Sequence, residues 1–382
     1  MQRRSSPVVV VGRFPPPLDG QTLATARLAD LVEEKRSVVR VSTSAPEGER
    51  LVSTEARWSW RRLAHYVSTG RRIRRRLAAV PDAPVLWASI SPHPLGHARD
   101  VLTTLPAFGA SRRVIAVVHR AYVDRMFQGM TARTARRVVG RCEAMVFLTD
   151  GLAERAAPFV PEAKRIVIPN TVGADVLCSR DEVHASQPQR QRRREVRLLF
   201  LGNLMPEKGY LDALAVAERL LADHDVRLDL IGRWPSPEAE RAFRQRVADS
   251  GLADRVTAHG GVAHAEVKSF VLGADVLLFP STHPSEALPV AVLEALGAGT
   301  PVVGYRHAGL PEVVRDGAGV LVPAGDVDAL AEATRHALAS WRSMSEGARS
   351  RFEAAYAPEA VQAAWLSLLD RTGTGSAGPD VS

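Results

Sequence analysis

Continuous apolar runs of strand length alternate with segments of helical spacing along most of the 382-residue chain. Runs of this kind, rich in β-branched residues, are typical of strands that are buried on both faces of a parallel sheet. They form two series, one at residues 8–12, 37–42, 85–90, 113–119, 144–149 and 165–170, and one at 196–202, 226–232, 255–260, 275–281, 300–305 and 319–324. We therefore predict an α/β protein with two domains, each a parallel sheet covered by helices.

A polar and charged stretch at residues 175–195 interrupts the alternation. We interpret it as the linker between an N-terminal domain at 1–174 and a C-terminal domain at 196–357. A last helix at 358–371 could return to the N-terminal domain, and the composition of the tail at 372–382 is typical of disorder. Two domains suit the length, because 382 residues exceed what one core usually supports. Two such sheets facing each other would leave a cleft between the C-terminal ends of their strands.

The composition is that of a globular protein, with 46% hydrophobic and 24% charged residues. No stretch approaches the roughly 18 apolar residues of a membrane-spanning helix, and the N-terminus lacks the apolar length of a signal peptide. We therefore expect a cytoplasmic location. Cys142 and Cys178 are isolated, which implies neither a disulfide framework nor a structural zinc site.

Positive charge is concentrated in the N-terminal half. Residues 1–194 hold 33 Lys and Arg against 17 Asp and Glu, whereas the remainder holds 17 against 25. This asymmetry indicates an anionic partner for the N-terminal half. A nucleic acid would be one such partner, but the sequence shows no aromatic stacking motif and no recognisable reader module.

The arginine excess centres on residues 58–80, where seven arginines alternate with apolar side chains. Such a pattern is typical of a basic amphipathic helix at an anionic membrane surface. It equally suits a helix that packs on its own domain with its arginines outward. The apolar members are Trp58, Trp60, Leu63, Tyr66, Val67, Ile73 and Leu77, and Arg133, Arg136, Arg137 and Arg141 could add a second basic face.

Glu286 and Glu294 lie in a predicted strand, loop, helix unit. The helix is expected over 291–299, with Pro289 in its first turn and Leu288 extended ahead of the proline. Free N–H groups and the helix dipole at that end favour a phosphate, and two carboxylates beside it suit a ligand that is part phosphate and part polyol. The spacing by itself carries no weight, because chance gives about five acidic pairs at any fixed spacing.

Four blocks of sequence, in this order, carry a family resemblance: FLGNLMPEKG (200–209), LDLIGRW (228–234), FPSTHPSEALPVAVLEALGAGTPVV (279–303) and HAGLPEVVRDGAGVLVPAGDVDALAEA (307–333). They resemble the nucleotide-sugar domain of glycosyltransferase family 4, retaining enzymes of the GT-B fold. The N-terminal half is similar at 15–31, 117–119 and 168–172. The resemblance implies two Rossmann-like domains facing across a cleft, a nucleotide-diphosphate sugar on the C-terminal domain and an acceptor on the N-terminal domain.

The resemblance also implies roles for individual residues, each of which has a plain structural alternative. Glu294 would hydrogen-bond the ribose of the nucleotide, or be an ordinary helix glutamate. Glu286 would lie near the donor sugar and the reacting carbon, or at a loop surface. Lys208 would neutralise the donor diphosphate, or be a solvated lysine at a helix start. The remaining positions predicted to contact the donor are Gly202, Leu288 and Val290.

The sequence departs from the family pattern at two places. Asn203 stands where many members have an arginine for the diphosphate, and Arg233, at the end of the next strand, could replace that charge. Pro289 stands in a loop that is usually richer in glycine, which removes one possible amide donor to the sugar. The loop around Glu286 therefore bears on which sugar is held.

In the N-terminal half, His119 ends an apolar run and is expected to project from a strand end. By resemblance it would lie near the donor sugar, whereas strand-end histidines in general are commonly structural. Gly20 would let the first loop approach a phosphate or acceptor, and Gly12 would permit the turn after the first strand. Asp19 replaces a glycine of the usual pair, and its charge has no explanation at this level.

Together with these features, the resemblance implies a retaining glycosyltransferase that would move a hexose-type sugar to an acceptor hydroxyl. The acceptor would be a glycan or a lipid-linked molecule at the inner face of the membrane. No metal or other cofactor is expected, and the diphosphate would leave with help from Lys208 and helix amides. The alternatives are a nucleotide-sugar epimerase or phosphorylase of the same fold and a non-catalytic nucleotide-sugar binding protein.

Overall fold

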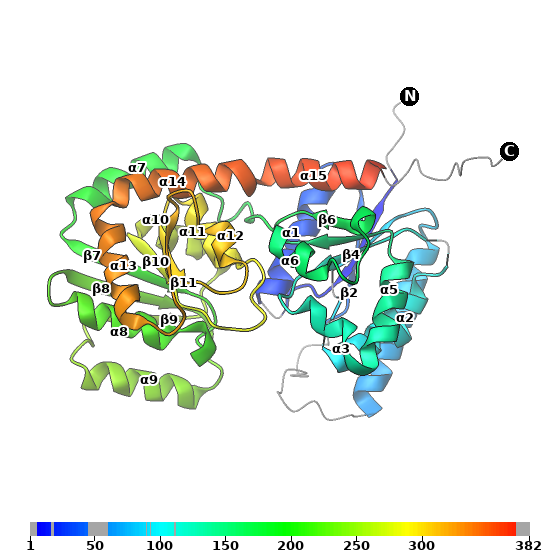
Figure 1. Cartoon of the computed structure of the whole chain (residues 1–382), viewed down its shortest axis with the longest axis horizontal. Helices are drawn as coiled ribbons and strands as arrows, with labels where there is room; N and C mark the ends of the chain where they lie inside the picture. Colours follow the sequence, from blue (N-terminus) through cyan, green and yellow to red (C-terminus); the bar gives the residue numbers. More distant parts are fainter. Residues whose placement is uncertain are drawn as a thin grey trace. The chain divides into compact units, whose positions relative to one another are not determined.

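The computed structural model describes residues 6–16, 19–44, 60–88, 90–91, 93–110 and 112–371. The chain forms two compact units. The N-terminal unit comprises residues up to Asn170 together with those from Pro358 onward, and the C-terminal unit comprises Thr171–Ala357. Each unit is built around its own six-stranded parallel sheet (Figure 1). The predicted fold class, an α/β protein with two parallel sheets, is confirmed.

The sheet of the N-terminal unit has the strand order β2-β1-β3-β4-β5-β6. Its strands are almost wholly apolar because helices cover both faces, as expected for parallel sheets. The strands are β1 (Val8–Gly12), β2 (Val38–Ser42), β3 (Val85–Trp87), β4 (Val114–Val118), β5 (Ala144–Phe147) and β6 (Arg165–Val167). The helical elements are α1 (Gly20–Glu33), α2 (Trp60–Ala78), α3 (Pro94–Arg99), a π-helical turn η1 (Asp100–Thr104), α4 (Leu105–Ala107), η2 (Val123–Phe127), η3 (Gly129–Thr131), α5 (Ala132–Arg141), α6 (Asp150–Ala156), η4 (Glu162–Lys164) and α15 (Pro358–Arg371).

The C-terminal helix α15 packs against α1 in the N-terminal unit (Figure 1). Trp365 and Leu368 join the buried cluster that contains Leu28 of α1. The amide of Gln362 donates to the carbonyl oxygen of Leu31 at 2.7 Å. The last described segment of the chain therefore completes the core of the unit that holds the first strand.

The sheet of the C-terminal unit has the order β12-β11-β10-β7-β8-β9. Its strands are β7 (Glu195–Leu201), β8 (Asp225–Ile231), β9 (Val256–Gly260), β10 (Val276–Phe279), β11 (Val302–Tyr305) and β12 (Gly319–Val322). Its helical elements are α7 (Arg180–Arg192), η5 (Pro206–Lys208), α8 (Tyr210–Leu220), α9 (Pro237–Asp249), η6 (His264–Glu266), α10 (Val267–Gly273), α11 (Val290–Gly297), α12 (Leu310–Val313), α13 (Val327–Ala339) and α14 (Trp341–Ala355).

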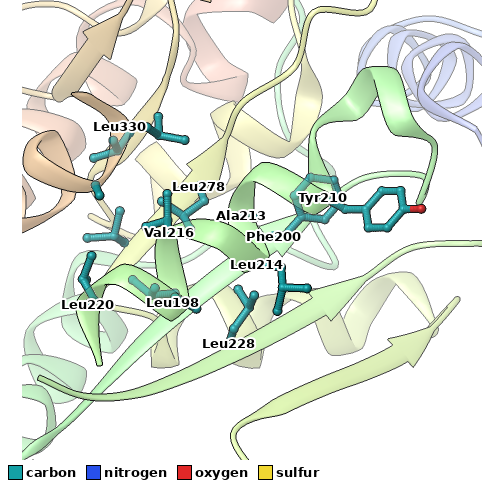
Figure 2. Close-up of a cluster of buried hydrophobic side chains, with 14 of the residues drawn as sticks. Leu198, Phe200, Tyr210, Ala213, Leu214, Val216, Leu220, Leu228, Leu278 and Leu330 are labelled. Atoms are coloured by element: carbon teal, nitrogen blue, oxygen red, sulfur yellow. The ribbon is translucent and has the colours of Figure 1, made fainter. Parts of the chain in front are cut away.

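The core on one face of this sheet is formed by strands β7, β8 and β10 with helices α8 and α13 (Figure 2). Leu198 and Phe200 of β7 lie between Leu228 of β8 and Leu278 of β10, and Leu330 of α13 belongs to the same cluster. All of these side chains are essentially inaccessible to solvent. The strand order reverses direction at β7, so the carboxyl ends of β7 and β10 form the switch point at which open α/β sheets bind ligands.

The predicted linker at 175–195 is wrong in its central part, because residues Arg180–Arg192 form helix α7 of the C-terminal unit. Ser179 and Glu182 close its N-terminus with a reciprocal capping box. The helix has no apolar stripe, and a buried arginine anchors it to the rest of the unit instead. Arg190 is 6% exposed and donates to the carbonyl oxygens of Val271 and Leu272.

Helix α2 occupies most of the predicted basic segment, of which residues 58 and 59 lie outside the described residues. Ile73 and Leu77 are buried, and the helix contacts η1 and β2 of its own unit. A side chain at Gly70 would collide with the backbone of Thr103, so the helix packs closely there. The arginines from position 71 to 76 are exposed. The structure shows the helix packed on its own domain with the arginines from position 71 to 76 outward, and the interpretation as a membrane-surface helix stays a prediction.

Candidate active site

The loops after β7 and β10 are in direct contact at the switch point of the C-terminal sheet. Gly209 has a left-handed φ of +83°, and a Cβ at this position would lie 2.1 Å from the carbonyl oxygen of Pro280. The backbone N–H of Thr282 donates to the carbonyl oxygen of Glu207 at 2.8 Å. Only glycine allows this approach, which brings the end of η5 against the start of the loop after β10.

Lys208 and Glu286, predicted from separate blocks of sequence, form an ion pair across this contact. The ammonium Nζ of Lys208 meets Oε1 of Glu286, and the two side chains are 20% and 10% exposed. Ser281, which is buried, donates from Oγ to the same carboxylate oxygen at 3.3 Å. A cation and an anion are thus held together at a mostly buried point, where an anionic ligand would compete with Glu286 for the lysine.

Glu294 is buried within α11, with 5% of its side chain exposed. Its Oε1 accepts from Nε2 of His264 at 3.0 Å, and Nδ1 of the same ring lies 2.6 Å from Oδ2 of Asp175. The sequence reasoning missed His264. Its position in the sequence could have indicated it, because His264 follows the end of β9 by four residues. It therefore lies at the carboxyl edge of the sheet, as the other candidate residues do.

The start of α11 differs slightly from the prediction. Pro289 is the N-cap residue rather than the first helical residue, and Val290 begins the helix, half-buried. The side chain of Leu288 is buried at 4% exposure, so this residue could meet a ligand only through its backbone. The N-terminal amides of α11, like those of any helix, lack intrahelical acceptors and favour an anion.

Arg233 and Asn203 lie close together after β8 and β7. A Cβ on Gly232 would overlap the carbonyl oxygen of Gly202, and the backbone N–H of Leu204 donates to the carbonyl oxygen of Arg233 at 3.0 Å. Both Asn203 and Arg233 are exposed. Among the described residues, the guanidinium of Arg233 has no hydrogen-bond or ion-pair partner. The structure thus brings the positive charge of Arg233, which has no partner among the described residues, beside Asn203.

The surroundings of Gly12, Gly20 and Asp19 in the N-terminal unit show what each residue does locally. Gly12 is the last residue of β1, where a Cβ would lie 2.7 Å from Cγ2 of Thr25, so close strand–helix packing requires it rather than a turn. Gly20 has open space around its Cα. Asp19 is the N-cap of α1: it accepts from the N–H groups of Gln21 and Thr22 and pairs with Arg13 at 2.8 Å. Its carboxylate therefore occupies the helix N-terminus itself.

His119 directly follows β4. Its Nε2 is buried and has no hydrogen-bond partner among the described residues. Burial, together with the charge of Arg120, lowers the pKa of His119 to about 4. The imidazole is consequently neutral near pH 7 and keeps an unused nitrogen for a ligand, which suits a group that accepts or shares a proton.

Solved structures show which fold this is. HepE from Anabaena, in complex with UDP, superposes with a TM-score of 0.70 at 14% identity over 95% of this chain and 99% of that one. Sucrose-phosphate synthase from Thermosynechococcus elongatus gives a TM-score of 0.74 at 17% identity over 97% and 100%. The fold is that of the GT-B glycosyltransferases. Identities this low carry the fold alone.

Sequence comparisons point to the same group of proteins. Residues 182–353 match the family model Glycosyl transferases group 1. A 2-deoxystreptamine N-acetyl-D-glucosaminyltransferase from Streptomyces fradiae is 32% identical over 56% of this chain and 52% of its own length. A GDP-mannose-dependent alpha-(1-6)-phosphatidylinositol monomannoside mannosyltransferase from Mycobacterium tuberculosis is 27% identical over 72% of both chains. The match spans about half the length of the Streptomyces relatives. These matches support a glycosyltransferase of the GT-B fold.

The unusual environment of His119 predicts an acid-sensitive contribution to stability. Its pKa falls from an ordinary value of 6.5 to about 4 in the folded protein, so the unfolded chain binds the proton more readily between these values. Stability should therefore fall as the pH drops from 6.5 to 4 and be unaffected by this group at higher pH. Thermal unfolding of wild type and His119→Gln across that range measures the effect. Equal acid sensitivity of the two proteins would contradict it.

Proposed function

We propose that the protein is a retaining glycosyltransferase of family 4, which transfers a hexose-type sugar from a nucleotide-diphosphate sugar to an acceptor hydroxyl. The observation that carries the proposal is the ion pair of Lys208 and Glu286 at the switch point of the C-terminal sheet, four residues ahead of helix α11, which holds Glu294. All three lie within the residues that match the glycosyl transferases group 1 model. One cation and two acids near the N-terminus of α11 support binding of a ligand that is part phosphate and part polyol.

In this proposal Glu294 accepts hydrogen bonds from the ribose hydroxyls, and the diphosphate lies at the N-terminus of α11. Lys208 exchanges its contact with Glu286 for the phosphate oxygens and stabilises the charge that develops on the leaving diphosphate. Glu286, released from the lysine, faces the sugar. Arg233 supplies the second positive charge in place of Asn203. The proposal uses no metal ion.

The acceptor belongs, in this proposal, to the N-terminal unit, where His119 offers a neutral imidazole at the end of β4. No covalent nucleophile is assigned, so attack on the same face of the sugar as the departing diphosphate accounts for retention. The names of the relatives include a 2-deoxystreptamine and a phosphatidylinositol mannoside acceptor. Both are hydroxyl-rich, and we propose a glycan or lipid-linked hydroxyl as the acceptor here.

Contact with an anionic membrane surface is the second part of the proposal. Ser68, Arg71, Arg72, Arg75 and Arg76 of α2 line one pocket of the surface. No helix among the described residues is long and apolar enough to cross a bilayer. The apolar side chains Ile73 and Leu77 are buried in the protein, so attachment through α2 would be electrostatic, with arginines meeting anionic headgroups.

Nucleoside diphosphates should stabilise the wild-type protein, because a ligand that binds only the folded state raises the melting temperature. At a ligand concentration of about 100 times Kd the gain is about 2.7 kcal/mol, which corresponds to a rise of several degrees. A thermal-shift panel of UDP, GDP, ADP and their sugars measures it. Glu294→Ala should abolish the response, whereas Glu332→Ala, a change at an exposed glutamate of α13, should keep it. No response of the wild type to any nucleotide would refute the proposed function.

Removing the guanidinium of Arg233 should weaken donor use. Loss of one charge-assisted hydrogen bond to a diphosphate costs about 1.5–3 kcal/mol, so kcat/KM for the donor should fall by about 10- to 100-fold in Arg233→Ala. Arg241→Ala, at an exposed arginine of α9, is the matched control. If Arg233 replaces the missing family arginine, Asn203→Arg should restore much of the loss in the double variant. Unchanged kinetics of Arg233→Ala would contradict this role.

Binding to phosphatidylglycerol vesicles should depend on the exposed arginines of α2 and on salt. A basic residue at such a surface contributes about 1 kcal/mol, so replacing Arg71, Arg75 and Arg76 by Gln should weaken partitioning by about 100-fold at low ionic strength. Sedimentation with vesicles measures this. The matched control replaces Arg241, Arg244 and Arg246 of α9, which are also exposed. Salt-insensitive partitioning, or equal losses in both triple variants, would count against an electrostatic site on α2.

A further inference from the structure

His264 joins two carboxylates of the C-terminal unit, and one of them is Glu294. The ring lies at the start of η6, with Nε2 3.0 Å from Oε1 of Glu294 and Nδ1 2.6 Å from Oδ2 of Asp175. Its side chain is 17% exposed. Asp175 lies four residues after Thr171, where the chain enters this unit. One imidazole therefore ties the entering segment, the end of the β9 loop and helix α11 together.

The chemistry of these two contacts defines the charge of the ring. A neutral imidazole carries one N–H, and its other nitrogen is an acceptor. An ionised carboxylate is an acceptor only, so a neutral ring could donate to one partner and would present a lone pair to the other. Both contacts are hydrogen bonds only when both nitrogens are protonated. Two short contacts to two acids thus favour the imidazolium.

We infer that His264 is a positively charged positioning residue for the donor nucleotide, an inference that rests on the proposed function. Its imidazolium fixes the carboxylate of Glu294 in one orientation, the one in which the carboxylate would meet the ribose hydroxyls. Asp175 in turn holds the ring and balances its charge, as second partners of functional histidines generally do.

Two other charged groups on the neighbouring elements, Lys268 and Glu266, have partners of their own. Lys268 of α10 pairs with Glu182 of α7 at 2.6 Å. Glu266 of η6 accepts from the backbone N–H of Ala263 at 2.8 Å. The charge that faces Glu294 from η6 is therefore that of His264. When the ring loses a proton at high pH, one of its nitrogens can no longer donate to its carboxylate partner, because both atoms are then acceptors. Glu294 would then lose its fixed orientation.

The test compares nucleotide affinity in wild type, His264→Gln and His259→Gln at about pH 6 and about pH 8.5, on either side of the usual histidine range. His259 is the matched control, because its Nε2 also contacts a carboxylate, Asp229, at 2.7 Å. Calorimetric titration with UDP and with GDP gives the dissociation constants. Comparing variants at the same pH removes the titration of the nucleotide itself.

At the lower pH, wild type should bind the nucleotide about tenfold more tightly than His264→Gln, the value of one charge-assisted hydrogen bond. At the higher pH this advantage should vanish, and His259→Gln should follow wild type throughout. Equal affinities at both pH values would overturn the positioning role. An advantage that stays constant with pH would overturn the role of the charge. If wild type binds neither nucleotide, the proposed function fails.

A measurement without nucleotide tests the charge of His264 separately from the proposed binding of a nucleotide. In protein labelled with ¹⁵N-histidine near pH 7, the ring that disappears in His264→Gln should show both nitrogens protonated, and Asp175→Asn should shift it toward the neutral form. A ring with one protonated nitrogen would overturn the charge assignment whatever the nucleotide result. Circular dichroism melting of each variant shows that it is folded.

Discussion

The candidate site depends on the contact between the loops after β7 and β10. Gly209 lies so close to the carbonyl oxygen of Pro280 that no side chain fits, and its left-handed backbone turns the chain directly into α8. This contact lies where the strand order of the sheet reverses, so neighbouring loops leave in opposite directions and expose helix and loop amides between them. Lys208 and Glu286, 78 residues apart in sequence, meet only because the two loops are held together there.

The electrostatic arrangement of the site is a set of paired charges built on a buried scaffold. Helix α11 is buried almost throughout, so Glu294 has little freedom and takes its partner from η6. Lys208 is paired with Glu286. A phosphate must therefore displace a carboxylate to reach the lysine, which favours ligands with strong, closely spaced negative charge. Arg233, by contrast, is exposed beside the same edge.

Arginine serves different physical purposes in the two units. On α2 the arginines from position 71 to 76 are exposed beside the buried side chains of Ile73 and Leu77, and they make the surface potential more positive. Arg190 of α7 is buried, and it donates to the carbonyl oxygens of Val271 and Leu272 at the end of α10. Arg13 neutralises Asp19, which caps α1. A count of arginines predicts the potential of a region but not which of these purposes each one has.

The sequence by itself determined the two parallel sheets, because buried strands need continuous apolar runs, and it pointed to Glu286, Glu294 and Lys208 through ordered blocks. Hydrophobic periodicity did not reveal α7, whose anchor is a buried arginine rather than an apolar stripe, nor the capping role of Asp19. Only the tertiary structure decided that Lys208 pairs with Glu286 and that His264 links Asp175 to Glu294. Such pairings join residues far apart in the chain, and neither hydrophobic periodicity nor local motif spacing encodes which distant side chains the strand order brings together.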